Sequence, residues 1–228
     1  MSTYLIINLL IIIIPLLMSF ERKIKFYKNY NHLIFSIFAV GIPFLIWDII
    51  AEKRKDWVFN SKFITGIKIF NLPVEEILFF VTVPYSLIFL YETFIYYKRP
   101  KRINIDGNYL LLLSFVSLTV SVFFIRLNYT FTLFFFLFIL FSVIAFSKVN
   151  FFKNRNLIFF FLFTFIPFFI VNYFLTSLPV VIYNSNAIWG IRILTIPLED
   201  FFYSLSLVTG YLFTYEFAKE KWKVKSVQ

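Results

Sequence analysis

Seven long apolar runs constrain this chain more than any other feature of its sequence. A helix needs about 20 apolar residues to cross ~30 Å of hydrocarbon, and each run approaches or reaches that length. The period-two alternation of a membrane barrel is absent. We therefore predict an all-α transmembrane protein of seven helices, with spans near 3–20, 33–51, 74–97, 109–125, 130–147, 157–175 and 197–217.

The composition excludes several other classes of protein. Hydrophobic residues make up 61% of the chain and charged residues 15%, too few for the polar surface of an ordinary soluble domain. The first run carries no Lys or Arg before it and no cleavage pattern after it, so we interpret it as a helix and not as a signal peptide. The absence of cysteine excludes disulfides and thiolate metal sites.

The net charge of +10 is explained by membrane orientation, and we expect no nucleic acid partner. The basic residues stand in short loops between the spans. Placing the carboxyl end inside puts 15 Lys and Arg on the cytoplasmic side and 7 outside, although the run "EKRKDW" at 52–57 opposes this bias. We expect a multi-pass protein of the cell (inner) membrane, with its amino end out and its carboxyl end cytoplasmic.

An internal repeat organises the chain. Shifting the sequence by 124 positions aligns residues 33–92 with 157–216 without a gap and gives 18 identities in 60 positions. The identities include "IPF" at 42–44 and 166–168, "NS" at 60 and 184, "GI" at 66 and 190, and "YE" at 91 and 215. A bias toward Ile, Leu and Phe does not produce aligned Pro, Gly, Asn and Glu.

The repeat predicts two three-helix units joined by one unpaired helix. We expect a first unit at 1–98, a linker helix at 99–129, a second unit at 130–218 and a basic cytoplasmic tail at 219–228. An odd number of linking helices makes both units cross in the same direction, so the repeats are parallel and related by an axis along the membrane normal. Equivalent residues then lie at the same depth.

Two adjacent acids open a span in each unit. Glu75 and Glu76 follow Pro73, and Glu199 and Asp200 follow Pro197. Capping is the plainer interpretation: with Leu72 and Ile196 as N-caps, the first acid of each pair is the third helical residue. Neighbouring helical residues point about 100° apart, however, so one acid of each pair must face another helix or a cavity. Ionisable groups at the hydrocarbon boundary are functional candidates.

Other polar residues are weighed against structural roles. Asp48 lies near the end of the second span, and its equivalent in the second unit is Asn172; a buried, hydrogen-bonded acid is as good an interpretation of Asp48 as a direct role. Glu92 and Glu216 end their spans at the opposite face, beside basic loops, and are predicted to form interfacial ion pairs.

The chemistry left open by this inventory is proton transfer. The chain lacks cysteine, a histidine cluster, a glycine-rich phosphate loop and a DxxxD pattern, so redox, metal-assisted hydrolysis and prenyl transfer lose their usual groups. We expect no cofactor and no metal. A carboxyl group shielded from water can donate a proton to an alkene, aromatic rings can stabilise the resulting cation, and a second carboxylate can take a proton back.

The segments at 47–85 and 183–203 resemble the two halves of the membrane-integral lycopene beta-cyclases. That family occurs as paired small subunits in some bacteria and as fused forms in archaea, other bacteria and fungi. Its PxE(E/D)xxF motif stands here as "PVEEILF" at 73–79 and "PLEDFFY" at 197–203, with Tyr203 in place of the final Phe.

The resemblance implies cyclisation of the ψ end groups of lycopene to β-ionone rings, giving β-carotene through γ-carotene. It favours Glu75 or Glu199 as the acid, with Glu76, Asp200 and Asp48 as base or cation stabiliser. The residues expected at the substrate are Phe79, Phe80, Tyr203, Trp47, Asn172, Pro73 and Pro197. The implied partners are lycopene and other lipophilic polyenes from the bilayer, membrane lipids, and other carotenoid enzymes.

Three alternatives remain open on the sequence. A seven-helix proton or ion transporter would also place carboxylates in the membrane, although a retinal-binding version lacks a lysine in 197–217. A non-catalytic carotenoid-binding protein would tolerate carboxylate-to-amide changes. A cyclase of the same fold could act on another polyene or close a single ring.

Overall fold

The computed structural model describes the chain apart from residues 99–106, 148–150, 152–154 and 226–228. Within the described residues there are seven α-helices: α1 (Thr3–Met18), α2 (Tyr30–Arg54), α3 (Val74–Tyr97), α4 (Gly107–Phe123), α5 (Asn128–Phe146), α6 (Arg155–Ser177) and α7 (Leu198–Lys225). Short strands connect some of them: β1 (Trp57–Phe59), β2 (Lys68–Ile69), β3 (Leu72–Pro73), β4 (Val181–Tyr183), β5 (Arg192–Ile193) and β6 (Ile196–Pro197). The prediction of seven helices is confirmed.

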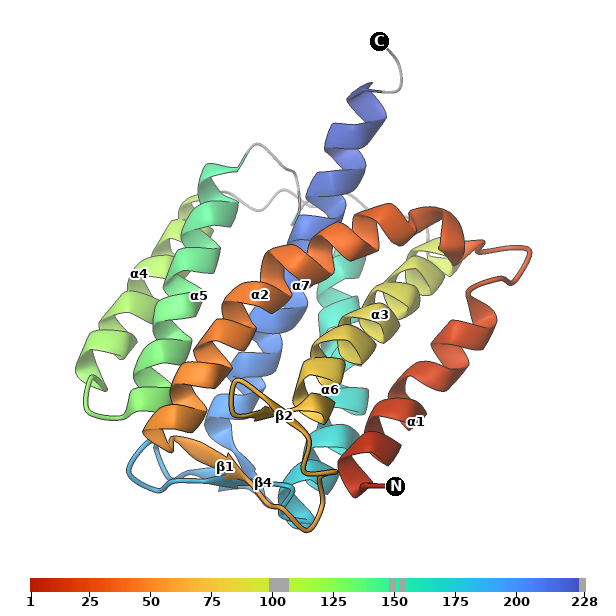
Figure 1. Ribbon diagram of the computed structural model, residues 1–228. Coiled ribbons are helices and arrows are strands. Elements are labelled where there is room, and N and C mark those ends of the chain that lie inside the picture. Colours follow the sequence, from red (N-terminus) through yellow and green to blue (C-terminus); the bar gives the residue numbers. More distant parts are fainter. Residues whose placement is uncertain (99–106, 148–150, 152–154, 226–228) are drawn as a thin grey trace.

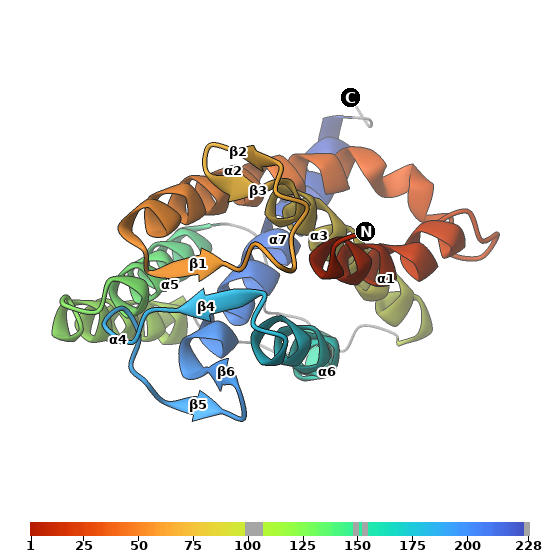
Figure 2. The same cartoon turned by 60° about the horizontal axis from the view of Figure 1, so that its bottom comes forward.

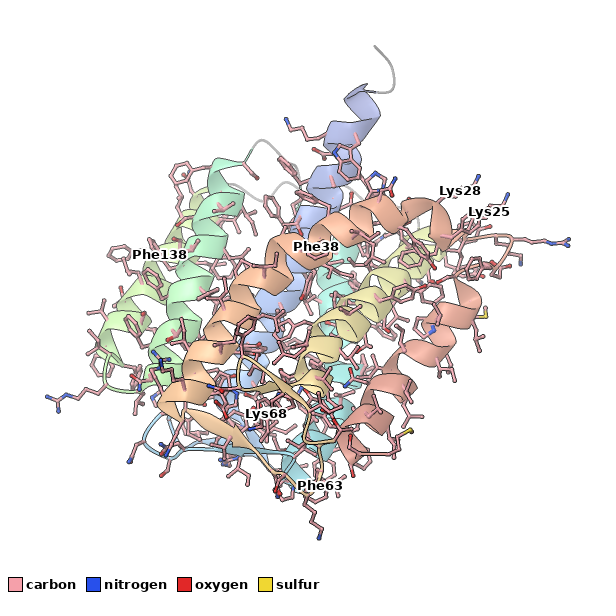
Figure 3. The ribbon with its side chains drawn as sticks, viewed as in Figure 1. Lys25, Lys28, Phe38, Phe63, Lys68 and Phe138 are labelled. Carbon is pink, nitrogen blue, oxygen red and sulfur yellow. The ribbon has the colours of Figure 1, made fainter. Side chains whose placement is uncertain are left out.

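Four of these helical segments are long and apolar enough to cross a membrane: Phe26–Arg54, Val74–Tyr97, Asn128–Phe146 and Asn156–Ser177. Two shorter apolar helices, Thr3–Met18 and Gly107–Phe123, stand beside them. Apolar side chains point outward over much of the molecule. Phe38 of α2 is 59% exposed and projects from the outer face of its helix, while Lys25 and Lys28 lie at one end of the bundle and Phe63 at the other (Figure 3). An apolar exterior over the helices is the surface that a bilayer requires.

All the strands lie at one end of the helical bundle, where α3 and α7 also begin (Figure 1). The two acidic motifs are therefore at the same end. Figure 1 also shows α4 and α5 as a hairpin at the outer edge of the bundle. Small polar residues join that hairpin: Ser114 and Ser142 share a hydrogen bond of 2.6 Å, and Ser121 donates to the carbonyl of Phe131. The predicted linker, 99–129, overlaps α4 and reaches the first two residues of α5.

The β1–β4 pair joins the two loops that the repeat makes equivalent (Figure 2). Val58 pairs with Ile182, which stands 124 residues later, and Trp57–Tyr183 and Phe59–Val181 flank that pair. If each residue is replaced by its repeat equivalent, 124 positions away, the same three antiparallel pairs are obtained. The register therefore has two-fold character, and the arrangement of the two units as parallel repeats stays a prediction.

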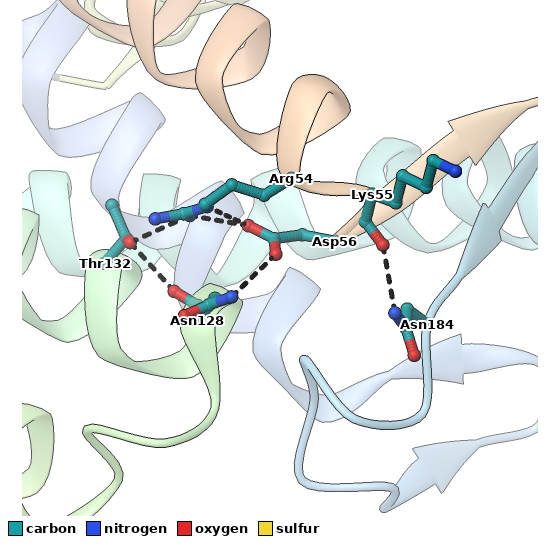
Figure 4. Close-up of polar contacts among 6 residues, drawn as sticks. All are labelled: Arg54, Lys55, Asp56, Asn128, Thr132 and Asn184. Atoms are coloured by element: carbon teal, nitrogen blue, oxygen red, sulfur yellow. Dashed lines mark hydrogen bonds and ion pairs between the residues drawn. The ribbon is translucent and has the colours of Figure 1, made fainter.

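Asp56 ties the two loops to the helices around them. Its side chain is 1% exposed and accepts hydrogen bonds from Arg54 and from Asn128 at the start of α5, and its backbone carbonyl accepts from the Asn184 amide. The Asn184 side chain in turn donates to the Lys55 carbonyl (Figure 4). This network connects α2, α5 and the loop after β4, so it fixes the end of the bundle where the acids lie.

The prediction that Leu72 and Ile196 are N-caps is wrong. Leu72 pairs with Ile69, so the chain stays extended through Pro73, which is the N-cap of α3 at ψ 143°. In the second unit Ile196 pairs with Ile193 in the same way, and α7 begins at Leu198. Each acidic pair consequently starts one position earlier in its helix than a cap at Leu72 or Ile196 would place it.

Candidate active site

A cavity of about 580 Å³ lies among the helices. Its lining comes from α1, α3, α6 and α7, with β1 and β4 at one end and single contributions from α2 and α5. Along α3 the lining runs from Glu76 to Leu90, and 14 steps at 1.5 Å per residue give a length of about 21 Å. The cavity is therefore an elongated slot along the helices, of a size typical for small-molecule sites.

The polar groups of the slot gather toward the strand end. Three carboxyl groups line it there, those of Asp48, Glu76 and Asp200, with four tyrosines, Tyr4, Tyr129, Tyr183 and Tyr203, while Tyr211 lines the slot farther along α7. Most of the remaining lining is aliphatic or aromatic. Such a slot holds a long hydrocarbon in its apolar part while one end of the hydrocarbon reaches the carboxyl groups.

Asp48 and Glu76 form the first carboxyl cluster. The Tyr4 hydroxyl donates to Glu76 Oε2 at 2.5 Å, and the carboxyl groups of Asp48 and Glu76 are neighbours in the slot. Two carboxyl groups can hydrogen-bond to each other only when one of them carries a proton. Asp48 Oδ1 is buried and accepts no hydrogen bond from the described residues. This cluster can therefore hold a proton beside an apolar space.

Asp200 forms the second cluster, and no second carboxyl group from the described residues hydrogen-bonds to it. The Tyr129 hydroxyl donates to its Oδ1 and the Tyr183 hydroxyl to its Oδ2, each at 2.8 Å. Withdrawal from water and then the adjacent Asp200 carboxylate raise the pKa of the Tyr183 hydroxyl, which stays a donor. Two hydroxyl donors stabilise the ionised form of a carboxylate. Asp200 thus faces the slot with each carboxyl oxygen held by a hydroxyl donor.

The difference between the clusters follows from two exchanges between the units. Asn172 stands where the first unit has Asp48; it also lines the slot, and its side-chain amide donates to the Phe168 carbonyl at 3.3 Å. Tyr183 stands where the first unit has Phe59, so Glu76 lacks the second tyrosine donor that Asp200 has. One unit supplies a carboxyl pair and the other a single carboxylate with two donors.

Glu75 and Glu199, the first acid of each motif, are not among the described residues that line the slot. Both are fully buried. Glu75 Oε1 accepts from the Ser2 hydroxyl and the Thr65 amide, both at 2.6 Å. Glu199 Oε1 accepts from the Thr130 hydroxyl at 2.7 Å and the Trp189 amide at 2.5 Å.

Each of these two acids therefore fastens the loop before its own helix to the start of another helix. The expectation that the two acids of a pair face in different directions matches this arrangement, but the first acid bonds to other segments, and the N-cap of α3 makes no side-chain cap hydrogen bond. In both, the second acid is the one that faces the slot.

The aromatic residues expected at the substrate divide into two groups. Phe79 and Tyr203 line the slot. Phe80 is 3% exposed and lies in the core, and Trp47 packs on Tyr203 and Phe136, with ring centroids 5.2 and 5.0 Å away; neither is among the described lining residues. Pro73 and Pro197 end the strands β3 and β6 and are buried outside the slot. Their expected roles at the substrate remain predictions.

Sequence reasoning missed four tyrosines of the slot: Tyr4, Tyr129, Tyr183 and Tyr211. A signal existed for two of them. Tyr4 and Tyr129 each stand at the start of a helix and are 125 residues apart. Their backbone amides donate hydrogen bonds to equivalent loops, to the carbonyls of Phe63 and Ala187 respectively. The gapless alignment began at residue 33 and so did not include them.

No group of three or more His, Asp or Glu side chains in the described part of the chain is arranged to hold a metal ion. A protein-family model described as "Lycopene cyclase" matches residues 1–94 and 126–218. The two matched segments cover most of the chain and leave out the residues around α4. No curated protein and no solved structure matches the chain.

Proposed function

Because the chain belongs to the lycopene cyclase family, we propose that it closes the ψ end groups of lycopene to β-ionone rings, giving β-carotene through γ-carotene. The family assignment makes it an enzyme of carotenoid biosynthesis, and its apolar helices fit a membrane protein. The observation that carries the specific reaction is the slot, in which a carboxyl pair and a separate carboxylate face one apolar space. Acid and base are the two groups that a redox-neutral cyclisation needs.

The Asp48–Glu76 pair is the proposed proton donor. Its proton adds to the terminal double bond of an end group, and the cation that forms is attacked by a nearby double bond of the same chain, which makes the ring C–C bond. Positive charge then lies within the new ring. Loss of a proton from a ring carbon to a carboxylate restores a double bond, so atoms and electrons balance without an oxidant or reductant. Exclusion of water prevents capture of the cation.

Asp200 is the proposed stabiliser of that cation. Its ionised form is supported by Tyr129 and Tyr183, and the ring faces of Phe79 and Tyr203 lie along the same slot. A preorganised carboxylate and aromatic faces favour positive charge where water is excluded. Either Asp200 or the carboxylate left on the Asp48–Glu76 pair can take the final proton.

Glu75 or Glu199 was expected to be the proton donor. We propose instead that both hold the residues of the site in position. Their liganded oxygens accept hydrogen bonds from a loop amide and a helix-start hydroxyl. Removing either acid would loosen the loop that holds the neighbouring Glu76 or Asp200. We therefore expect a loss of activity from either change, through geometry and not through the proton.

Pigment analysis of a lycopene-accumulating bacterial host tests this function. The wild-type chain is expected to convert lycopene to γ- and β-carotene, and Asp48→Asn and Glu76→Gln to leave lycopene unconverted at equal membrane abundance. Glu92→Gln is the matched control, because Glu92 bonds Tyr215 and Lys219 away from the slot. Unchanged lycopene with abundant wild-type protein, or full conversion by Asp48→Asn, would refute the proposal.

We also propose that the strand end, with the carboxyl groups, faces outward from the cytoplasm, as the Lys and Arg bias indicates. Lys62 stands in the loop after β1 and Lys28 in the short 3-10 helix Phe26–Asn29 before α2, and both are exposed. These two segments lie at opposite ends of the bundle (Figure 1). In intact cells Lys62→Cys should react with an impermeant maleimide, and Lys28→Cys should react only after permeabilisation. The reverse pattern would invert the orientation.

A further inference from the structure

We infer that the slot opens to the bilayer at one place, between α1 and α6, and that the end group of the polyene enters there. This inference rests on the proposed function and specifies how its substrate reaches the carboxyl groups. The same opening would admit the acyl chain of a lipid, and the experiment below separates the two occupants.

The exposure of the lining residues locates the opening. Of the described residues that line the slot, those exposed at the molecular surface are Leu10 and Ile14 of α1 (69% and 66%) and Ile170 and Phe174 of α6 (53% and 48%). Figure 2 shows α1 and α6 near one another on the same side of the molecule. All four side chains are apolar, so this opening meets lipid and not water.

The equivalent place in the other half of the molecule is closed. Under the repeat α6 corresponds to α2 and α1 to α5, so the matching contact is between α2 and α5. There Phe136 packs against Phe44 and Trp47, with ring centroids 5.1 and 5.0 Å apart. Three large rings fill the space where the slot would otherwise continue.

Two exchanges account for the difference. Val171 stands in α6 where α2 has Trp47, and Ile11 stands in α1 where α5 has Phe136 if the 125-residue offset of Tyr4 and Tyr129 is extended. Val171 and Ile11 both line the slot, whereas Trp47 and Phe136 are not among its described lining residues. Val171 and Ile11 are smaller than Trp47 and Phe136, so they leave space open between α1 and α6.

A single opening has a consequence for the reaction. Only one end of a symmetric polyene can reach the carboxyl groups during one visit, because the slot has no second described opening for the other end. The second ring then requires the one-ring product to withdraw into the bilayer and return with its other end. The one-ring product is therefore expected to appear free in the membrane before the two-ring product.

The chain contains no cysteine, so single cysteines can be labelled without background. Ile170→Cys places a thiol at the opening, and Ile46→Cys is its matched control. Ile46 is the repeat equivalent of Ile170, is also 53% exposed, and lies outside the described lining. Each variant, reconstituted in phosphatidylcholine vesicles, is treated with a bulky maleimide, and lycopene is then added from donor vesicles.

The expected result is that labelling lowers the initial conversion rate of Ile170→Cys at least tenfold and leaves Ile46→Cys within twofold of its unlabelled rate. Equal rates for the two labelled variants would overturn the inference. Lycopene retained by the washed protein is measured in parallel. If no unlabelled chain converts lycopene, the proposed function fails, and loss of retained pigment on labelling only Ile170→Cys still supports the opening.

A second variant tests the same opening without a label. Val171→Trp introduces the residue that closes the equivalent place, and it is expected to lower both lycopene retention and conversion while the thermal unfolding temperature stays within a few degrees of wild type. A folded Val171→Trp protein with wild-type retention and conversion would contradict the inference. Co-purified lipid that is lost on labelling while lycopene conversion is unaffected would assign the opening to a lipid instead.

Discussion

Replacing Asp48 by Asn should remove catalysis while leaving the fold intact. Asn is the residue that the second unit carries at the equivalent position, Asn172. An amide at position 48 can still donate to Glu76, so one hydrogen bond of the pair is kept, and the carboxyl proton that the pair holds is lost. The buried Asp48 Oδ1 accepts no hydrogen bond from the described residues, so the change leaves few partners unsatisfied.

These contacts set the magnitudes. Exchanging one neutral or charge-assisted hydrogen bond for another of similar geometry alters the free energy of unfolding by under about 1 kcal/mol. A positioned general acid contributes about 10²–10⁴ in rate, which corresponds to about 2.7–5.4 kcal/mol of activation free energy. The expected variant is therefore as stable as wild type and at least about a hundred times slower.

Glu199→Gln should show the opposite balance and serves as the comparison. Glu199 Oε1 accepts two hydrogen bonds, and Gln retains one oxygen to accept both, without the charge. Charge-assisted bonds contribute about 1.5–3 kcal/mol and neutral ones about 0.5–1.5 kcal/mol, so the two bonds together should weaken by about 2–3 kcal/mol. Stability falls, and activity falls through the loosened loop.

The assay combines initial rates of lycopene conversion in vesicles with thermal unfolding of the same preparations in detergent. The reasoning predicts that rate and stability separate: Asp48→Asn loses rate at constant unfolding temperature, and Glu199→Gln loses unfolding temperature. A wild-type rate for Asp48→Asn, or a rate loss that tracks an equal loss of stability, would refute it.

Three further changes have defined outcomes. Tyr183→Phe removes one of the two donors to Asp200. It should slow turnover by about 10–100-fold, since a hydrogen bond to a charged group contributes about 1.5–3 kcal/mol. Initial rates measure this, and an unchanged rate would contradict the role of Asp200 in stabilising the cation. Asp56→Ala leaves Arg54 without its buried partner and should lower the free energy of unfolding by about 2–3 kcal/mol, read from thermal unfolding. Gly190→Ala meets no atom within 4 Å but stands at φ +82°, so backbone strain alone should cost about 1–2 kcal/mol, and a stability equal to wild type would contradict that conformation.

Much of the architecture could be predicted because each part of it is a local or periodic property. The spans follow from apolar runs, and the structure begins and ends its seven helices within a few residues of most predicted limits. The ion pairs predicted for Glu92 and Glu216 are confirmed, with Lys219 Nζ 2.6 and 3.6 Å from their carboxylates. The predicted N-cap position was wrong because the β2–β3 pairing holds Leu72 and Pro73 extended. Strands of two residues are too short to show a recognisable pattern in the sequence.

The candidate site was predicted only in part for a different reason. The acidic pairs stand out in an apolar chain, and the 100° between neighbouring helical residues shows that their members must diverge. That argument does not say which acid faces inward. The answer depends on where the starts of α1 and α5 place Ser2 and Thr130, because the hydroxyls of these residues donate hydrogen bonds to the first acid of each pair.

The sequence by itself determined the membrane class, the number of helices, the repeat and the inventory of acids, since hydropathy and self-similarity are written in residue order. Only the tertiary structure decided that Asp48, Glu76 and Asp200 line one slot and that four tyrosines not singled out in the sequence line it too. It also decided that the slot opens between α1 and α6 and not between α5 and α2. These are contacts between residues distant in the chain, and the volumes of Val171 and Trp47 acquire a meaning only once the helices that face them are in place.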